Sequence, residues 1–362
     1  MDIYGHTRLY NTFFERNFAP MKKNNDQFCR LGKVGGQAVL EGVMMKSGDD
    51  TCLAVRGEDG VITTRKSKFT SLRKKNKFFN IPVLRGVVNF VEMMMLSMST
   101  LTASAEMLGI DDAEPETKFE KWLTEKLGDK LMAVIMTLAT ILGVALSIGL
   151  FFLIPTYATK GIKYLMGGEM HWALRSAIEG VLKIAIFIGY IAAVSLMKDI
   201  RRTFEYHGAE HKCVFCYEKG LELTVENAKG CSRLHPRCGT SFIFVMLFIS
   251  IFITMFIHID HTLLRTLVKL LLMPLAIGIG FEFIMFAGKH DNFITRALSA
   301  PGLWMQKLTT KEPDDGQLEV AIAALKGAIP AEFPEEAETN ETNDTAEDIP
   351  SADNIDEGES RE

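Results

Sequence analysis

Two histidines and a glutamate stand close together in the segment HGAEH, residues 207–211. Positions i and i+4 of a helix lie on one face, so the imidazoles of His207 and His211 can bind one metal ion. Glu210 can then act as a general base on metal-bound water, as in the inverted form of the zincin motif. Gly208 lowers helix stability by about 1 kcal/mol, which weakens the expectation of a helix here.

A catalytic zinc ion needs a third protein ligand, and the segment CSRLHPRC, residues 231–238, offers His235 and Cys238. If the apolar helices before and after this loop are antiparallel neighbours, both ends of the loop return to the same membrane face. Four protein ligands would make the site structural, whereas three ligands and a water would make it catalytic. Alternative third ligands are Glu218, Glu222 and Glu226. Without a metal, the histidines would be ordinary interfacial polar residues and Cys238 a buried one.

The second half of the same stretch carries Cys213 and Cys216 in a C-x-x-C pattern. Such a pair suggests metal or thiol redox chemistry. A zinc site would need a second pair at suitable spacing, and Cys231 is too far from Cys238 for that. No thioredoxin-like pattern surrounds the pair, and cytosolic thiols stay reduced. We therefore expect Cys213 and Cys216 to pack on the buried face of a helix.

Long apolar segments dominate the chain and must position these residues. A spanning helix needs about 20 mostly apolar residues. Bilayers exclude unpaired backbone, so segments of this kind are helices. Four transmembrane helices are predicted, at residues 131–155, 178–197, 241–257 and 267–287.

A fifth apolar segment, residues 81–110, carries a polar stripe that includes Arg85 and Glu92 at helical spacing. One interpretation is an amphipathic helix lying on the inner leaflet. The other is a re-entrant or spanning helix whose stripe lines a cavity. Glu282, inside the fourth predicted helix, is a further candidate functional residue, with Arg85, Lys289, His290 or the metal centre as possible partners.

Basic residues set the predicted orientation. Residues 61–90 contain eight basic residues and no acidic one, and residues 198–240 contain eight Lys or Arg. The positive-inside rule places both segments and both termini in the cytoplasm. We therefore predict a multi-pass membrane protein, with the lipid bilayer as one partner, an unknown substrate or protein as another, and no nucleic acid.

The remaining segments are short and polar. We predict a mainly α protein with a small cytoplasmic β-rich region at residues 33–80, where residues 57–60 form a hairpin turn. The acidic tail at residues 329–362 has the composition of a disordered segment. The other predicted parts are an N-terminal extension at 1–32, a cytoplasmic loop with the candidate site at 198–240, and a cytoplasmic C-terminal region at 288–328.

Three long motifs carry a family resemblance: GGQAVLEGVMMKS at residues 35–47, the segment around HGAEH together with SRLHPRCGTSF, and AGKHDNFITRALSAPGLWMQKLTTKEPDD from residue 287. Together they resemble the YqhQ-like family of bacterial membrane proteins, a family of unknown function labelled a predicted metal-dependent enzyme. The resemblance covers residues 33–326. It favours as site residues His207, Glu210, His211, His235, Arg237 and Cys238, and it leaves out Cys213 and Cys216.

Three functions follow from these observations. The first is a metal-dependent hydrolase with zinc or a similar divalent ion at His207 and His211. The second is a non-catalytic scaffold or membrane-protein assembly factor in which the metal is structural. The third is a transporter in which Arg85, Glu92 and Glu282 line a polar path. The chain has no phosphate loop, dinucleotide fingerprint or serine elbow that would indicate another class.

Overall fold

The computed structural model describes residues 30–110, 131–235, 237–257, 259, 261–289 and 293–334. Its chain divides into two compact units. The sheet unit takes the described residues within 1–70, 202–235 and 310–362, and the helical unit takes those within 71–201 and 236–309.

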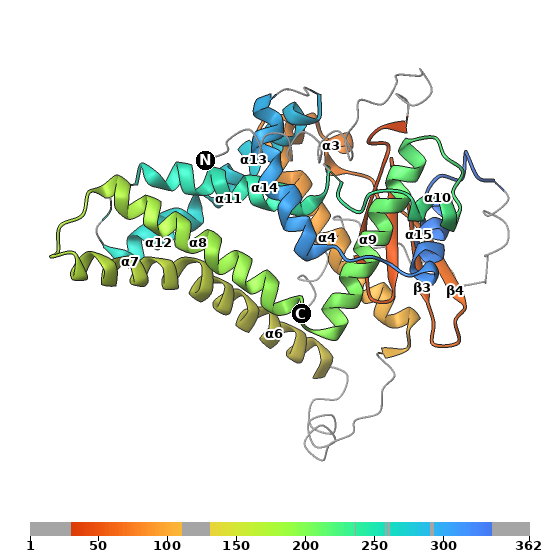
Figure 1. Ribbon diagram of the computed structural model, residues 1–362, viewed down its shortest axis with the longest axis horizontal. Coiled ribbons are helices and arrows are strands. Elements are labelled where there is room, and N and C mark those ends of the chain that lie inside the picture. Colours follow the sequence, from red (N-terminus) through yellow and green to blue (C-terminus); the bar gives the residue numbers. More distant parts are fainter. Residues whose placement is uncertain are drawn as a thin grey trace, which may run out of the picture. The chain divides into compact units, whose positions relative to one another are not determined.

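The sheet unit is built on a four-stranded antiparallel meander in the order β1-β2-β3-β4 (Figure 1). The strands are β1 (Val34–Val39), β2 (Gly42–Ser47), β3 (Asp50–Arg56) and β4 (Ile62–Lys68). The predicted turn at residues 57–60 is confirmed, since the N–H of Gly60 donates to the carbonyl of Gly57 at 3.0 Å. Strand β4 is mostly exposed and rich in Lys and Arg, which discourages pairing with a further strand at this edge.

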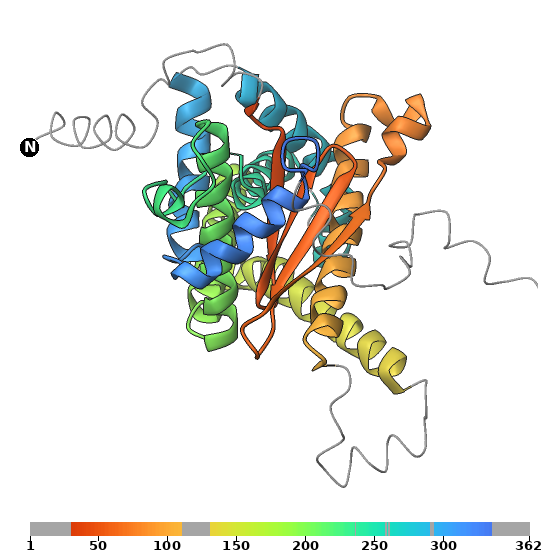
Figure 2. The same cartoon turned by 90° about the vertical axis from the view of Figure 1, so that its right-hand side faces the viewer.

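One face of the sheet packs on two helices, α9 (Lys198–Glu218) and α15 (Asp315–Gly327) (Figure 2). Asp314 and Gln317 form a capping box that starts α15. A short helix, α10 (Val225–Lys229), follows α9. Cys213 and Cys216 are both 0% exposed in this core, which is the packing role that the sequence predicts.

Glycine lets both β2 and α9 approach β1 closely at Gly36. A Cβ at this position would lie 2.5 Å from the backbone carbonyl oxygen of Met44 and 2.8 Å from Sδ of Met45, both in β2, and 3.2 Å from Cγ of Glu210 in α9. Its neighbour Gly35 has open space around the same position. The two glycines therefore differ in purpose, because only Gly36 is needed for these close contacts.

The helical unit contains the apolar segments. Its elements are α3 (Leu72–Lys75), η1 (Lys77–Asn80), α4 (Leu84–Met107), α6 (Leu131–Ile148), the π-helical η4 (Gly149–Leu153), α7 (Ile154–Leu165), α8 (Trp172–Val194), α11 (Gly239–Met255), α12 (Thr262–Leu271), α13 (Met273–Lys289) and α14 (Phe293–Thr309). Helix α11 packs on α8, α13 and α14, and α4 packs on α13.

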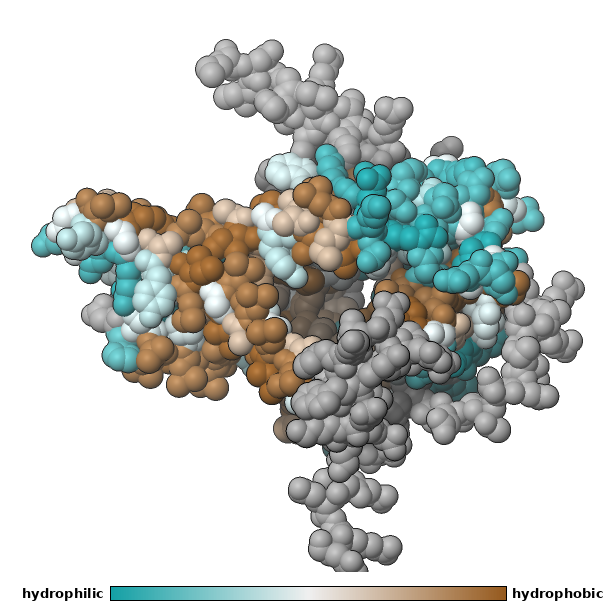
Figure 3. Space-filling model, turned by 90° about the horizontal axis from the view of Figure 1, so that it is seen from below, coloured by the Kyte–Doolittle hydropathy of each residue, from teal (hydrophilic) through white to brown (hydrophobic). Residues whose placement is uncertain are grey.

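Four helical stretches are long and apolar enough to cross a membrane, by length and composition: Leu84–Met107, Thr137–Leu165, Trp172–Val194 and Thr262–Phe286. Hydrophobic residues predominate on the visible surface of this unit, with polar residues among them (Figure 3). The predicted third span at residues 241–257 is the shorter apolar helix Gly239–Met255. A mainly helical chain with a small N-terminal sheet and four apolar helices is thus confirmed, but residues 84–107 join the candidate spans.

Gly36→Ala tests the close packing of β1 against β2 and α9. Overpacking of this kind costs about 1–3 kcal/mol, so hydrogen exchange in the buried part of α9, residues 206–218, should accelerate by at least about fivefold. Mass spectrometry of peptides from that segment measures the rate. Gly35→Ala is the matched control and should leave it unchanged. Equal rates in both variants would contradict the assigned contact.

Candidate metal centre

His207 and His211 lie one turn apart on the same face of α9, as the sequence predicts. Their ring centroids are 4.4 Å apart, with an interplanar angle of 64°. The side chain of His211 is buried at 2% exposure. Gly208 sits on another face, where a Cβ would overlap the backbone carbonyl oxygen of Lys311. The glycine that weakens the helix in isolation is therefore required by the chain segment that crosses it.

Two sets of contacts fix this part of α9. Glu41, in the turn between β1 and β2, accepts from Arg202 in an ion pair and from the Tyr206 hydroxyl at 3.2 Å. Burial raises the pKa of Tyr206, so its hydroxyl stays protonated and donates. The N–H of Lys311 donates to the carbonyl of Phe204 at 2.8 Å. Glu41 has a φ of 47°, an uncommon value for a non-glycine residue, and it places its carboxylate beside the helix.

The ring of His211 is oriented by a backbone carbonyl. Its Nδ1 lies 2.6 Å from the carbonyl oxygen of Arg233. A carbonyl only accepts, so Nδ1 carries the proton and Nε2 presents its lone pair. This Nε2 is buried and has no hydrogen-bond partner among the described residues. Metal-ligating histidines have this arrangement, with one ring nitrogen bound to an acceptor and the other directed at the metal.

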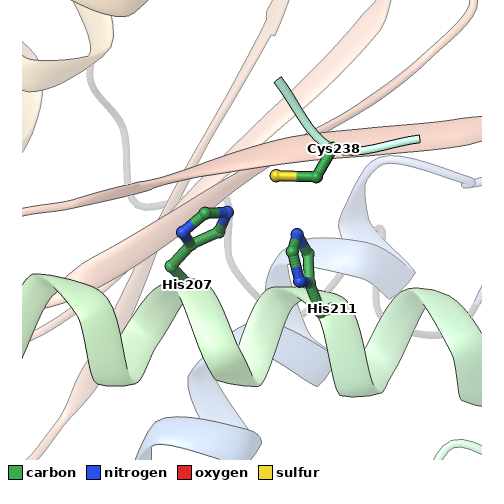
Figure 4. Close-up of side chains that lie close together, drawn as sticks. All are labelled: His207, His211 and Cys238. Carbon is green, nitrogen blue, oxygen red and sulfur yellow. The ribbon is translucent and has the colours of Figure 1, made fainter. Parts of the chain in front are cut away.

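Cys238 supplies a third ligand atom. The ligand atoms of His207, His211 and Cys238 all lie within 4.8 Å of one another (Figure 4). Tetrahedral zinc, with Zn–N of about 2.0 Å and Zn–S of about 2.3 Å, separates its ligand atoms by about 3.3–3.8 Å, so small side-chain rotations would bring these three onto one ion. Cys238 is only three positions beyond His235, a residue of the sheet unit, and the short connection limits how far it can lie from α9.

His235 lies beside the two histidines of α9. Its ring centroid is 5.7 Å from that of His211 and 4.5 Å from that of Phe215. Its Nε2 lies 3.3 Å from Oε2 of Glu218, whose other oxygen accepts the N–H of Gly32 at 2.9 Å. A buried histidine and carboxylate thus adjoin the candidate ligands. The expectation that His235 is itself a ligand stays a prediction.

Glu210 and the other predicted carboxylates do not belong to the group of candidate ligand atoms. The side chain of Glu210 is buried at 6% exposure, and its Cγ lies against Gly36 of the sheet. The metal-ligand group found among the described residues contains no carboxylate, so neither Glu222 nor Glu226 belongs to it. Glu218, an expected alternative ligand, is instead the partner of His235.

The buried thiols of this unit form a separate cluster. Burial raises the pKa of the Cys213 thiol. A hydrogen bond from Cys216 lowers the pKa of Cys231 to about 7, although burial opposes this. The sequence excludes Cys231 as a zinc partner of Cys238 because of their spacing, and the structure pairs it with Cys216. Sequence reasoning missed this pair, because the two positions are 15 residues apart with no shared motif.

The remaining predicted site residues lie in the helical unit. Arg85 donates from Nε to Glu282 at 2.7 Å, so Arg85 is the partner of Glu282 among the possibilities left open by the sequence. Glu92 is buried and accepts the N–H of Leu72 at 2.6 Å, which satisfies the start of α3. Arg237 is exposed. Glu92 and Glu282 are thus each held by contacts within the helical unit.

Comparisons with known proteins agree on one family. The profile of the family described as "Protein of unknown function (DUF1385)" matches residues 81–331. The chain is 35% identical over 292 residues to the "Uncharacterized protein YqhQ" of Bacillus subtilis (strain 168), an alignment that covers 80% of this chain and 90% of the relative. No solved structure matches.

Exposure predicts which thiol reacts first. Cys238 is partly exposed, whereas the other four described cysteines are 6% exposed or less. In a Cys29→Ser background, which removes the one cysteine outside the described residues, maleimide should label a single site quickly in folded protein from which a chelator has removed bound metal. Peptide mass spectrometry should locate the label at Cys238. Equally fast labelling of Cys231 would contradict the burial described above.

Proposed function

Since the chain belongs to the DUF1385 family, whose description names no activity, we propose a function from the chemistry of the site: a metal-dependent hydrolase of the membrane. His207, His211 and Cys238 hold one divalent ion, and Glu210 is the general base. The four apolar helices support a place in the bilayer. The positive-inside rule supports a cytoplasmic location for the site and both termini. The similarity to a Bacillus subtilis protein supports the bacterial cytoplasmic membrane as the location.

The observation that carries this proposal is the buried, unpartnered Nε2 of His211. Burying a polar atom without a partner is unfavourable by about 1–3 kcal/mol. A metal ion removes that penalty, and the Nδ1 bond to Arg233 already selects the tautomer that binds metal. Since the lone pair faces His207 and Cys238, the three residues form a set that fits a metal rather than three unrelated polar contacts.

The donor set favours zinc. Two imidazoles and one thiolate are ligands typical of Zn²⁺, whereas Mg²⁺ and Ca²⁺ prefer oxygen. Such an ion, when bound by three protein ligands, supplies an acidified water for hydrolysis. Glu210 would accept the proton from this water. Glu218 and His235 would form a second pair able to transfer a proton beside the site. Peptides, lipids and small molecules all remain substrates consistent with this chemistry.

A structural metal is the second candidate, and the place of Cys238 favours it. Cys238 is the N-cap of α11, and its Sγ accepts the N–H of Thr240 at 3.5 Å. A metal bound by this residue and by α9 would close the loop of residues 219–237. Closing a long loop stabilises a fold even where no reaction follows. The protein would then be a membrane scaffold or assembly factor.

Metal content tests the site itself. We expect detergent-purified protein to contain about one zinc per chain, because three ligands converge on one position. His211→Ala should remove it almost completely, and Cys238→Ser should weaken it by at least tenfold. Elemental analysis after exhaustive dialysis measures the metal. His171→Asn, which keeps the N-cap of α8, is the control and should retain full content. Metal-free wild-type protein that also fails to take up added zinc would refute the site.

Glu210→Gln separates catalysis from a structural metal. For a hydrolase, this variant keeps its zinc and loses function by about 10²-fold or more, since general-base catalysis contributes that much. If the metal is only structural, the variant keeps both its zinc and its function at the wild-type level. Complementation of a strain that lacks the chain reports function, and elemental analysis reports the metal. Loss of zinc in Glu210→Gln would show a supporting role for Glu210 and would contradict its assignment as the base.

A further inference from the structure

A short basic and apolar segment precedes α4 in the helical unit. It consists of α3, which ends at Lys75, and η1, which begins at Lys77 and is followed by Ile81. Both elements pack on α4 (Figure 1). Residues 60–91 contain no Asp or Glu, so the positive charge of this segment is not balanced by acidic residues close to it in the sequence.

The exposed side of the segment combines lysines with large apolar side chains. Lys74, Lys75 and Lys77 are exposed. Phe78 is 60% exposed and Ile81 is 48% exposed. Residues i and i+3 of a 3₁₀-helix lie on the same side, and the N–H of Ile81 donates to the carbonyl of Phe78 at 3.4 Å. Two exposed apolar side chains on one side, beside three lysines, form an amphipathic surface.

Hydrogen bonds hold the backbone of this segment in place. The buried carboxylate of Glu92 accepts the N–H of Leu72 at 2.6 Å and the hydroxyl of Ser71 at 2.8 Å, which joins the start of α3 to α4. Oδ1 of Asn76 accepts the N–H of Phe78 at 2.9 Å and caps the start of η1. The exposed side chains are therefore presented by an ordered turn of backbone.

An uncommon backbone conformation separates this segment from α4. Val83 has a φ of 69°, a rare value for a β-branched residue. Its N–H donates to Oε1 of Glu282 at 3.2 Å, and Nε of Arg85 donates to the same oxygen at 2.7 Å. Since the start of α3 is bound to Glu92, eight residues beyond the first residue of α4, the chain folds back along the first two turns of that helix. Glu282 thus stabilises the turn that presents the amphipathic surface.

The chemistry of this surface matches a leaflet that carries anionic phospholipids. Clustered lysines beside a membrane-associated helix are attracted to anionic head groups, and apolar side chains such as Phe and Ile enter the layer beneath them. Arg73 has a different role, because its Nη2 donates to Oδ1 of Asn89 at 3.2 Å within the helical unit. Helix α4, to which the segment is joined, is one of the stretches apolar enough to cross a membrane.

We propose that Lys74, Lys75, Lys77, Phe78 and Ile81 bind the surface of a leaflet rich in anionic phospholipids. The three ammonium groups contact lipid phosphates, and the two apolar side chains enter the interfacial layer. This contact holds the N-terminal end of α4 at the membrane surface and makes its position depend on lipid composition. The surface contains no residue of the candidate metal centre and stands apart from the proposed hydrolase activity.

Fluorescence quenching by brominated lipid tests the proposal on the full chain. Phe78→Trp places a fluorophore on the surface, and the wild-type chain gives the background emission of its three tryptophans. The proteins are reconstituted in nanodiscs of acyl-brominated phosphatidylcholine, with or without phosphatidylglycerol. We expect phosphatidylglycerol to increase the quenching of the added tryptophan by about twofold or more, and high salt to reverse the increase because it screens the charges.

Variants assign the effect to the lysines. In the Phe78→Trp background, a triple Lys→Gln replacement at positions 74, 75 and 77 should abolish the increase caused by phosphatidylglycerol. A triple Lys→Arg replacement at the same positions should keep it, since the charge is preserved. Equal quenching with and without phosphatidylglycerol, or an increase that persists in the triple Lys→Gln variant, would overturn the proposal.

Val61→Trp is the matched control for exposure. Val61 is 58% exposed, close to the value for Phe78, but it follows the acidic residues Glu58 and Asp59 in the sequence. Phosphatidylglycerol should therefore leave the quenching at this position unchanged. An equal increase at positions 61 and 78 would show a general effect of the lipid and would count against a specific surface.

Discussion

The close approach of α9 to its neighbours is the constraint on which the sheet unit depends. Gly36 leaves space for both β2 and the helix, and Gly208 leaves space for the backbone of Lys311 beside the helix. From Tyr206 to Glu218 almost every position of α9 is buried, although the segment is rich in polar side chains. Each buried polar group then needs a partner. Lys212, for example, donates to the carbonyl of Lys229 at 2.9 Å and pairs with Glu312. These polar contacts join residues 219–235 and 310–313 to the helix, beside the apolar side chains of the same segment that enter the core.

This constraint explains how much of the site could be predicted. The i, i+4 pair is local, so helical periodicity alone places His207 and His211 on one face. The packing of Cys213 and Cys216 follows in the same way from their spacing on an apolar face. The sheet could also be predicted from the sequence, because its hairpin loops are short and carry turn residues. In each case the property needed only the sequence within one element or one turn.

The remaining features of the fold and of the candidate site depend on contacts between segments that are distant in the sequence. The sequence shows that His235 and Cys238 are within reach of α9, but not that Nε2 of His235 lies at Glu218. It shows Glu179 only as an interruption of an apolar segment, since its partners Arg265 and Lys269 are 86 and 90 residues away on α12. The helix at residues 239–255 is shorter than a typical span, whereas the polar stripe of residues 84–107 sits on a helix of full length. Apolar composition predicts the position of these helices well. The partners of their polar side chains depend on the neighbouring helices, which composition does not identify.

The assignment of a metal to the candidate centre follows from one buried polar atom. At His211 a lone pair is buried without a donor among the described residues, so the missing group is a cation. The imidazole ring is already fixed by the hydrogen bond from its Nδ1 to the Arg233 carbonyl. A chain that keeps an unsatisfied group in a rigid frame has accepted a loss of stability that binding can recover, and that is the physical reason to assign a ligand to this position.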